Sequence, residues 1–195
     1  YDVSKIISVG GSNISERKYY KTVSGALISS IINEKAVDDN SRIISGNVLT
    51  GEQVNLDGFL GFYHHQLSVI PEGNRHKFFL TDGWLSPGFN SFSASRAYPS
   101  WLLPKSKSYN LDTNLNGEER AFVVSGQYEK VFPFDIYPVQ LLKSIITNDI
   151  EKMENLGIYE VSPEDFALCE FVCTSKMNLQ KIVTVSYTHL RAHET

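Results

Sequence analysis

The hydrophobic pattern of the chain changes once along its length, and this change limits the folds open to it. Residues 5–70 hold short apolar runs separated by glycines, a pattern typical of strands joined by tight turns. Residues 138–172 instead repeat apolar residues every three or four positions, the period of a helix with one buried face. Strands followed by helices indicate an α+β fold, which we predict for this chain.

The first module should be a small sheet with one helix packed on it. Strands are predicted at 5–9, 18–23, 42–49 and 59–70, and Ser24 is suited to cap a helix between the second and third of them. The apolar face of that helix would consist of four aliphatic residues: Leu27, Ile28, Ile31 and Ile32.

A loop or linker is predicted after this sheet, followed by a hairpin. Residues 83–107 are rich in serine, proline and aromatic residues and lack either period. Asn116-Gly117 is a hairpin signal, and residues 120–125 would form the short strand after it.

Three helices are predicted in the second module. Pro138 suits a first helical position, and Asn148 or Asp149 can cap a second helix that ends at Gly157. The third would run over 163–172. Its start is marked by a capping hydroxyl, a proline and two carboxylates at the positive end of the helix dipole: Ser162, Pro163, Glu164 and Asp165.

These patterns divide the chain into four segments. They are residues 1–82, 83–125, 126–183 and an adapter-like tail at 184–195. From Thr184 the helical period is lost, and the tail resembles a translated sequencing adapter. We therefore exclude it from the expected fold as an artefact; the alternative is a genuine disordered C-terminus.

Composition excludes several classes of function. The net charge is −4 and no basic stripe is present, so nucleic acid is not an expected partner. The longest apolar stretch, at 25–32, is far shorter than the roughly 20 residues of a membrane-spanning helix. Two cysteines are too few for a disulfide scaffold or a structural zinc site.

The residues most suited to chemistry have structural explanations. Cys169 and Cys173 lie four apart on the third helix, on one apolar face with Phe166, which favours core packing over a redox or metal role. His64 and His65 would point to opposite faces of a strand. Tyr63, His65, Leu67 and Val69 would form its apolar side, which leaves His64 solvated and His65 half-buried.

The acidic pairs also have simpler explanations than catalysis. Glu118-Glu119 fits a hairpin rim and Glu164-Asp165 fits a helix N-terminus. Dinucleotide, phosphate-loop, metalloprotease and nucleophile-elbow motifs are missing from the sequence. We therefore predict no catalytic, cofactor-binding or metal-binding residue in this chain.

Several stretches are too particular to be generic. They are RIISGNVLTG at 42–51, FLGFY at 59–63 with VIPEG at 69–73, NLNGEERAFV at 114–123, GQYEKV at 126–131, and LGIYE at 156–160 with ALCEFVC at 167–173. In this order they resemble the A subunit of the bacterial Na+-translocating NADH:quinone oxidoreductases. The resemblance covers nearly all of residues 1–183 and is to the C-terminal half of that protein, in the style of Bacteroides-type versions.

The resemblance implies a fold and a role. It implies a β-grasp-like module of the soluble-ligand-binding type followed by a small C-terminal helical domain, without the family's N-terminal half. It also implies a cofactor-free subunit on the cytoplasmic face of the inner membrane, with a structural or quinone-access role. Its partners would be the other subunits, especially the membrane subunits, and quinone. The complex would use NADH, FAD, FMN, riboflavin, an iron-sulfur centre and quinone through these other subunits.

Two alternatives stay open at this point. One is a free-standing β-grasp module that binds a small ligand, with the stretch from Trp84 to Phe92 as its pocket wall. The other is a thiol-dependent enzyme that uses Cys169 and Cys173.

Overall fold

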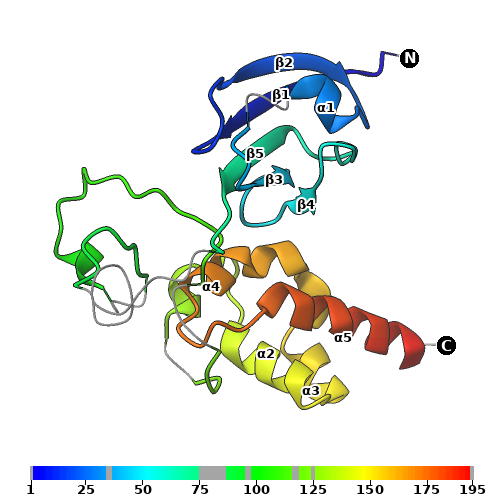
Figure 1. The fold of residues 1–195 in the computed structure, drawn as a ribbon. Coiled ribbons are helices and arrows are strands. Elements are labelled where there is room, and N and C mark those ends of the chain that lie inside the picture. The colour runs from blue at the N-terminus through cyan, green and yellow to red at the C-terminus, as the bar shows by residue number, and fades with distance from the viewer. Residues whose placement is uncertain are drawn as a thin grey trace. The chain divides into compact units, whose positions relative to one another are not determined.

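The chain divides into two compact units in the computed structural model (Figure 1). Unit 1 comprises residues 1–92 and 98–114, and unit 2 comprises residues 93–97 and 115–195. The structure describes residues 2–33, 37–74, 87–94, 98–115, 119–123 and 126–193, with the backbone alone for 189–193. The predicted α+β class is confirmed. The finer segment boundaries at 82, 125 and 183 stay predictions.

A mixed sheet forms the body of unit 1. Its strands are β1 (Ser4–Gly11), β2 (Lys18–Val23), β3 (Ser41–Ser45), β4 (Glu52–Val54) and β5 (Gln66–Pro71), in the order β2-β1-β5-β3-β4. The central neighbours β1 and β5 are parallel, with Val9 opposite Leu67, and the other three pairs are antiparallel.

Glycines explain where the strands depart from the sequence prediction. The strand predicted at 5–9 extends through Gly11. Gly11 has a φ of +130°, and a Cβ at this position would lie 1.9 Å from the Val69 carbonyl oxygen, so only glycine fits here. The strand predicted at 42–49 ends at Ser45 because Gly46 takes a φ of +99°. Within 59–70 only the part from Gln66 is a strand. The prediction missed β4.

The helix of unit 1 is shorter than predicted. α1 covers Ile28–Ile31 and begins after Leu27, so the assignment of Ser24 as its cap was wrong. Gly25, with a φ of +71°, turns the chain first, and Leu27 then forms a β-bridge with Phe59. Three of the four predicted face residues are buried: Ile28, Ile31 and Ile32.

The core of unit 1 lies between α1 and one face of the sheet. Apolar side chains of β1 and β5 alternate inward, as the pleat of a strand requires. Ile7, Leu67 and Val69 are fully buried there and pack with Ile28 and Ile32.

Helices make up most of unit 2. They are α2 (Pro138–Ile146), α3 (Ile150–Asn155), α4 (Ala167–Val172) and α5 (Leu179–His193), with 3-10 turns at Tyr128–Lys130, Ile158–Glu160 and Pro163–Phe166. The predicted starts at Pro138 and Asp149 are confirmed, since the Lys152 backbone N–H donates to the Asp149 side chain. Gly157 ends the second helix with a φ of +85°.

The third predicted helix begins with a 3-10 turn before α4. Both the backbone N–H and the hydroxyl of Ser162 donate to Asp165 Oδ2, at 2.7 and 2.8 Å. This confirms a polar cap at the predicted place. α5 continues to His193, so the expected loss of helix from Thr184 was wrong. The origin of residues 184–195 stays a prediction.

The hairpin prediction is only partly tested. Asn116-Gly117 lies outside the described residues, while residues 120–123 form no strand.

The helices build the core of unit 2. The ring of Phe166 contacts the ring of Phe132, with 4.8 Å between their centroids. Val139, Leu142 and Leu179 are fully buried in this core. None of the described helices is long and apolar enough to span a bilayer.

Leu142→Ala should lower the free energy of unfolding by about 2–5 kcal/mol, because it leaves a cavity in this core. Leu168→Ala is the matched control: Leu168 is 47% exposed, and its truncation should cost about 1 kcal/mol or less. Urea unfolding followed by circular dichroism measures both. Equal losses for the two variants would contradict the assignment of the core.

Candidate functional site

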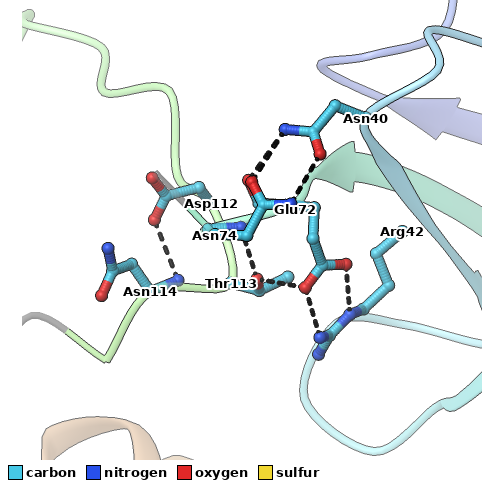
Figure 2. Close-up of polar contacts among 8 residues, drawn as sticks. Asn40, Arg42, Glu72, Asn74, Asp112, Thr113 and Asn114 are labelled. Carbon is cyan, nitrogen blue, oxygen red and sulfur yellow. Dashed lines mark hydrogen bonds and ion pairs between the residues drawn. The ribbon is translucent and has the colours of Figure 1, made fainter. Parts of the chain in front are cut away.

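The carboxyl end of β5 carries a connected group of polar side chains (Figure 2). Arg42 Nε donates to Glu72 Oε2 at 2.9 Å and Arg42 Nη2 donates to Glu72 Oε1 at 2.5 Å. β3 supplies the arginine and the residue after β5 supplies the glutamate. This two-pronged geometry is the strongest form of an arginine–carboxylate pair.

A returning segment of the chain joins this ion pair. Thr113 Oγ1 donates to Glu72 Oε1 at 2.9 Å and accepts from the Gly73 N–H at 2.7 Å. Gly73 suits this approach because a Cβ there would lie 2.4 Å from the Asn114 nitrogen. We call Arg42, Glu72 and Thr113 the clasp.

Two asparagines extend the clasp on one side, as Figure 2 shows. Asn40 Nδ2 donates to Asn74 Oδ1 at 3.2 Å, and Asn74 Nδ2 donates back to Asn40 Oδ1 at 3.0 Å. The backbone N–H of Glu72 also donates to the Asn40 carbonyl at 3.0 Å. The reciprocal amide pair fixes the chain direction just after β5.

The electrostatics of the clasp suit anchoring better than proton transfer. Hydrogen bonds from Arg42 lower the pKa of Glu72, with a smaller contribution from Thr113 and with burial opposing them. A carboxylate whose oxygens already accept from a guanidinium and a hydroxyl is a weak base. The clasp therefore holds two distant segments together.

The opposite end of the sheet holds a half-buried histidine. His64 Nδ1 shares a hydrogen bond of 2.8 Å with Ser45 Oγ, which also accepts from the Gly61 N–H at 3.0 Å. A Cβ on Gly61 would lie 2.4 Å from His64 Nδ1. The predicted burial of the two histidines was wrong, because His64 is half-buried and His65 is exposed. The prediction assumed the alternation of a strand, but both histidines precede β5, which begins at Gln66.

Three aromatic side chains of the preceding loop face solvent. We call residues 59–63 the aromatic loop. Phe59, Phe62 and Tyr63 are 65%, 69% and 86% exposed, and the Phe62 carbonyl accepts from Lys5 Nζ at 2.6 Å. A concentration of exposed aromatic residues on an ordered loop is typical of a contact surface.

The two cysteines lie in the core of unit 2, as predicted. Both are buried and free, and Tyr128 Oη donates to Cys173 Sγ at 2.7 Å. Burial raises the pKa of Cys169 to about 12. The Cys169 thiol is therefore protonated near neutral pH and is a poor nucleophile.

The remaining predicted groups have defined places. Asp165 accepts from Ser162, as a residue at a helix N-terminus does. The Glu118-Glu119 pair falls partly outside the described residues. Over the part of the chain that the structure describes, no three His, Cys, Asp or Glu side chains gather as a metal site. The prediction of no catalytic or cofactor-binding residue stays a prediction.

Comparison with known proteins gives the family resemblance a firm basis. Residues 6–55 match the family model described as "NQRA C-terminal domain". The chain is 37% identical over 176 residues to the A subunit of the Na(+)-translocating NADH-quinone reductase of Shewanella frigidimarina, covering 90% of the chain and 39% of that protein.

Other relatives carry the same description. The one from Hahella chejuensis is 38% identical over 189 residues, which is 96% of the chain and 41% of that protein. The one from Pasteurella multocida is 40% identical over 176 residues, which is 90% of the chain and 38% of that protein. The chain thus spans about two-fifths of the length of these relatives.

Glu72→Gln should destabilise the chain at pH 7 by about 1–2 kcal/mol, because it removes the charge that Arg42 and Thr113 engage. The pKa of Glu72 is lower in the folded chain, so this stability is present above the ordinary glutamate pKa and is lost as pH falls through the folded value. Chemical unfolding at pH 7 and at acidic pH measures the difference.

Glu52→Gln serves as the control, because Glu52 is exposed on the edge strand β4. It should change stability by no more than about 0.5 kcal/mol. A Glu72→Gln effect that equals the control at pH 7, or that persists undiminished in acid, would count against the clasp.

Both thiols should react slowly with a thiol reagent in the native chain and rapidly in urea, because Cys169 and Cys173 are buried. A colorimetric disulfide reagent measures the two rates. Rapid native labelling of either residue would reopen the thiol-enzyme alternative.

Proposed function

Because this chain is related to the A subunits of the Na(+)-translocating NADH-quinone reductases over 90% or more of its length, we propose that it acts as part of a peripheral subunit of such a complex. The complex would couple NADH oxidation and quinone reduction to Na+ export. The sequence relationship is the observation that carries this proposal.

The fold of unit 1 supports the assignment of a β-grasp-like module. The order β2-β1-β5-β3-β4 places the first and last strands side by side and parallel, with a hairpin on either side. A helix between the second and third strands packs on one face of this sheet. A helical domain follows in unit 2.

Within the complex, this chain would have a structural or quinone-access role and no cofactor of its own. NADH, FAD, FMN, riboflavin, the iron-sulfur centre and quinone chemistry would belong to other subunits. The buried, protonated Cys169 thiol and the engaged Glu72 carboxylate support a role without catalysis. The proposed place is the cytoplasmic face of the inner membrane, held there by partner subunits, chiefly the membrane subunits.

The alternative of a free-standing ligand module has one structural feature in its favour. A surface hollow of about 270 Å³ is lined by Leu27, Ser29, Leu56 and Asp57. It is smaller than the roughly 300–1,000 Å³ of most ligand pockets. Of the wall predicted for this module, Trp84 lies outside the described residues and Phe89 is largely exposed.

A pull-down separates these two functions. The full-length form of the protein, tagged and expressed in its host, should bring down flavin fluorescence and Na+-stimulated NADH:quinone reductase activity from solubilised membranes. If the tagged protein elutes alone and without flavin from a host with an active pump, the ligand module becomes the better account.

The aromatic loop should contribute to partner contacts. Phe62→Ser combined with Tyr63→Ser should raise the Kd for the partner subunits by about tenfold, which corresponds to losing roughly 1.4 kcal/mol of contact energy. Less flavin should then co-purify. Tyr19→Ser on β2 is the control, since Tyr19 is equally exposed in the same unit. Full recovery of flavin with the double variant would remove the aromatic loop from the interface.

A further inference from the structure

The segment between β5 and the clasp differs from the rest of the chain in charge. Residues 75–111, which we call the arm, contain five of the 18 Lys and Arg and one of the 22 Asp and Glu. The remaining residues therefore hold 13 basic and 21 acidic side chains. A basic segment is thus set into an otherwise acidic chain.

Aromatic residues are also concentrated in the arm. It contains eight of the 23 Phe, Trp and Tyr residues in about one fifth of the chain, and both tryptophans, Trp84 and Trp101. Tryptophan together with lysine and bulky apolar residues is the composition found at membrane–water interfaces.

The clasp joins the residues that flank the arm on either side. The Gly73 N–H reaches Thr113 Oγ1 at 2.7 Å, and the Thr113 N–H donates to the Pro71 carbonyl at 3.3 Å. The residues just before and just after the arm therefore meet at the end of β5.

The described parts of the arm, residues 87–94 and 98–111, hold together through their own side chains. Lys107 Nζ donates to the Phe89 carbonyl at 2.7 Å and to Asn90 Oδ1 at 3.2 Å. The rings of Phe92 and Tyr109 lie 5.7 Å apart, and Lys107 Nζ lies 5.5 Å from the Tyr109 centroid. These contacts order a segment with little regular secondary structure.

Residues 99–105, which we call the tip of the arm, include exposed apolar side chains and an exposed cation. Pro99–Trp101 form a 3-10 turn closed by the bond from the Leu102 N–H to the Pro99 carbonyl, at 2.9 Å. Trp101 is 56% exposed and Leu102 is 67% exposed. Lys105, three residues further on, is exposed as well.

We propose that the arm binds directly to the surface of an anionic lipid bilayer. Trp101 and Leu102 enter the headgroup region, and Lys105 faces the anionic headgroups. Charge complementarity favours this occupant, because the basic arm is attracted to an anionic leaflet while the acidic remainder is repelled from it. This contact goes beyond the proposed function and does not depend on it.

Vesicle co-sedimentation with the full chain tests the proposal. The chain should sediment with vesicles of phosphatidylcholine mixed with phosphatidylglycerol, far less with phosphatidylcholine alone, and less as salt is raised. Tryptophan fluorescence should shift to the blue on binding, and both tryptophans lie in the arm.

Variants of the tip decide whether the arm is responsible. Trp101→Ser with Leu102→Ser should weaken binding by about tenfold or more, and Lys105→Ala by about fivefold. Lys130→Ala and Tyr19→Ser are the controls, since both residues are exposed outside the arm. They should leave binding within about twofold of the parent. Circular dichroism of each variant verifies that the fold is kept.

Three results would overturn the proposal. They are no sedimentation with anionic vesicles, equal sedimentation with both kinds of vesicle, and tip variants that bind as the parent does. If the parent chain does not sediment with vesicles and the tip variants reduce the flavin that co-purifies, the arm contacts a protein partner and not lipid. The assignment to the reductase would stand in that case.

Discussion

The parallel pair of β1 and β5 holds unit 1 together. The two strands are far apart in the sequence, and their inward side chains, Ile7, Leu67 and Val69, are fully buried. Burial of three such residues is worth roughly 1.5–3 kcal/mol each. The strand β5 also carries the aromatic loop before it and Glu72 after it, so the surfaces that we relate to function depend on this pair.

Periodicity predicted the elements whose side chains repeat without interruption. β2 has the predicted residues, α2 begins at Pro138 as predicted, and Asp149 and Gly157 bound the second helix as expected. These features depend on local chemistry, which a single sequence carries. The α+β class follows from the same patterns.

Features that depend on contacts between distant segments could not be predicted in this way. The half-burial of His64 depends on Ser45 and Gly61, and the clasp depends on Thr113 returning to Glu72 across some forty residues. A histidine beside a histidine, or a glutamate after a proline, gives no local signal of such a partner. The glycines at 61 and 73 were hints that another group approaches the chain closely there.

The reactive groups of both units are occupied in packing or in joining segments of the chain. Both cysteines are packed in the core of unit 2, and the Arg42–Glu72 ion pair joins distant segments of unit 1. Unit 1 exposes apolar side chains at two places, the aromatic loop before β5 and Trp101 with Leu102 in the arm. Exposed apolar residues on ordered loops suit a protein that works through binding.

A segment exchange tests the central claim most directly. Residues 1–183 would replace the matching part of the A subunit from Pasteurella multocida, in a strain that lacks its own copy, with the equivalent segment from Hahella chejuensis as the control. We predict that both chimeras assemble and restore Na+-stimulated NADH:quinone reductase activity in membranes. Activity restored by the control segment but not by this chain would contradict the proposed role in such a reductase.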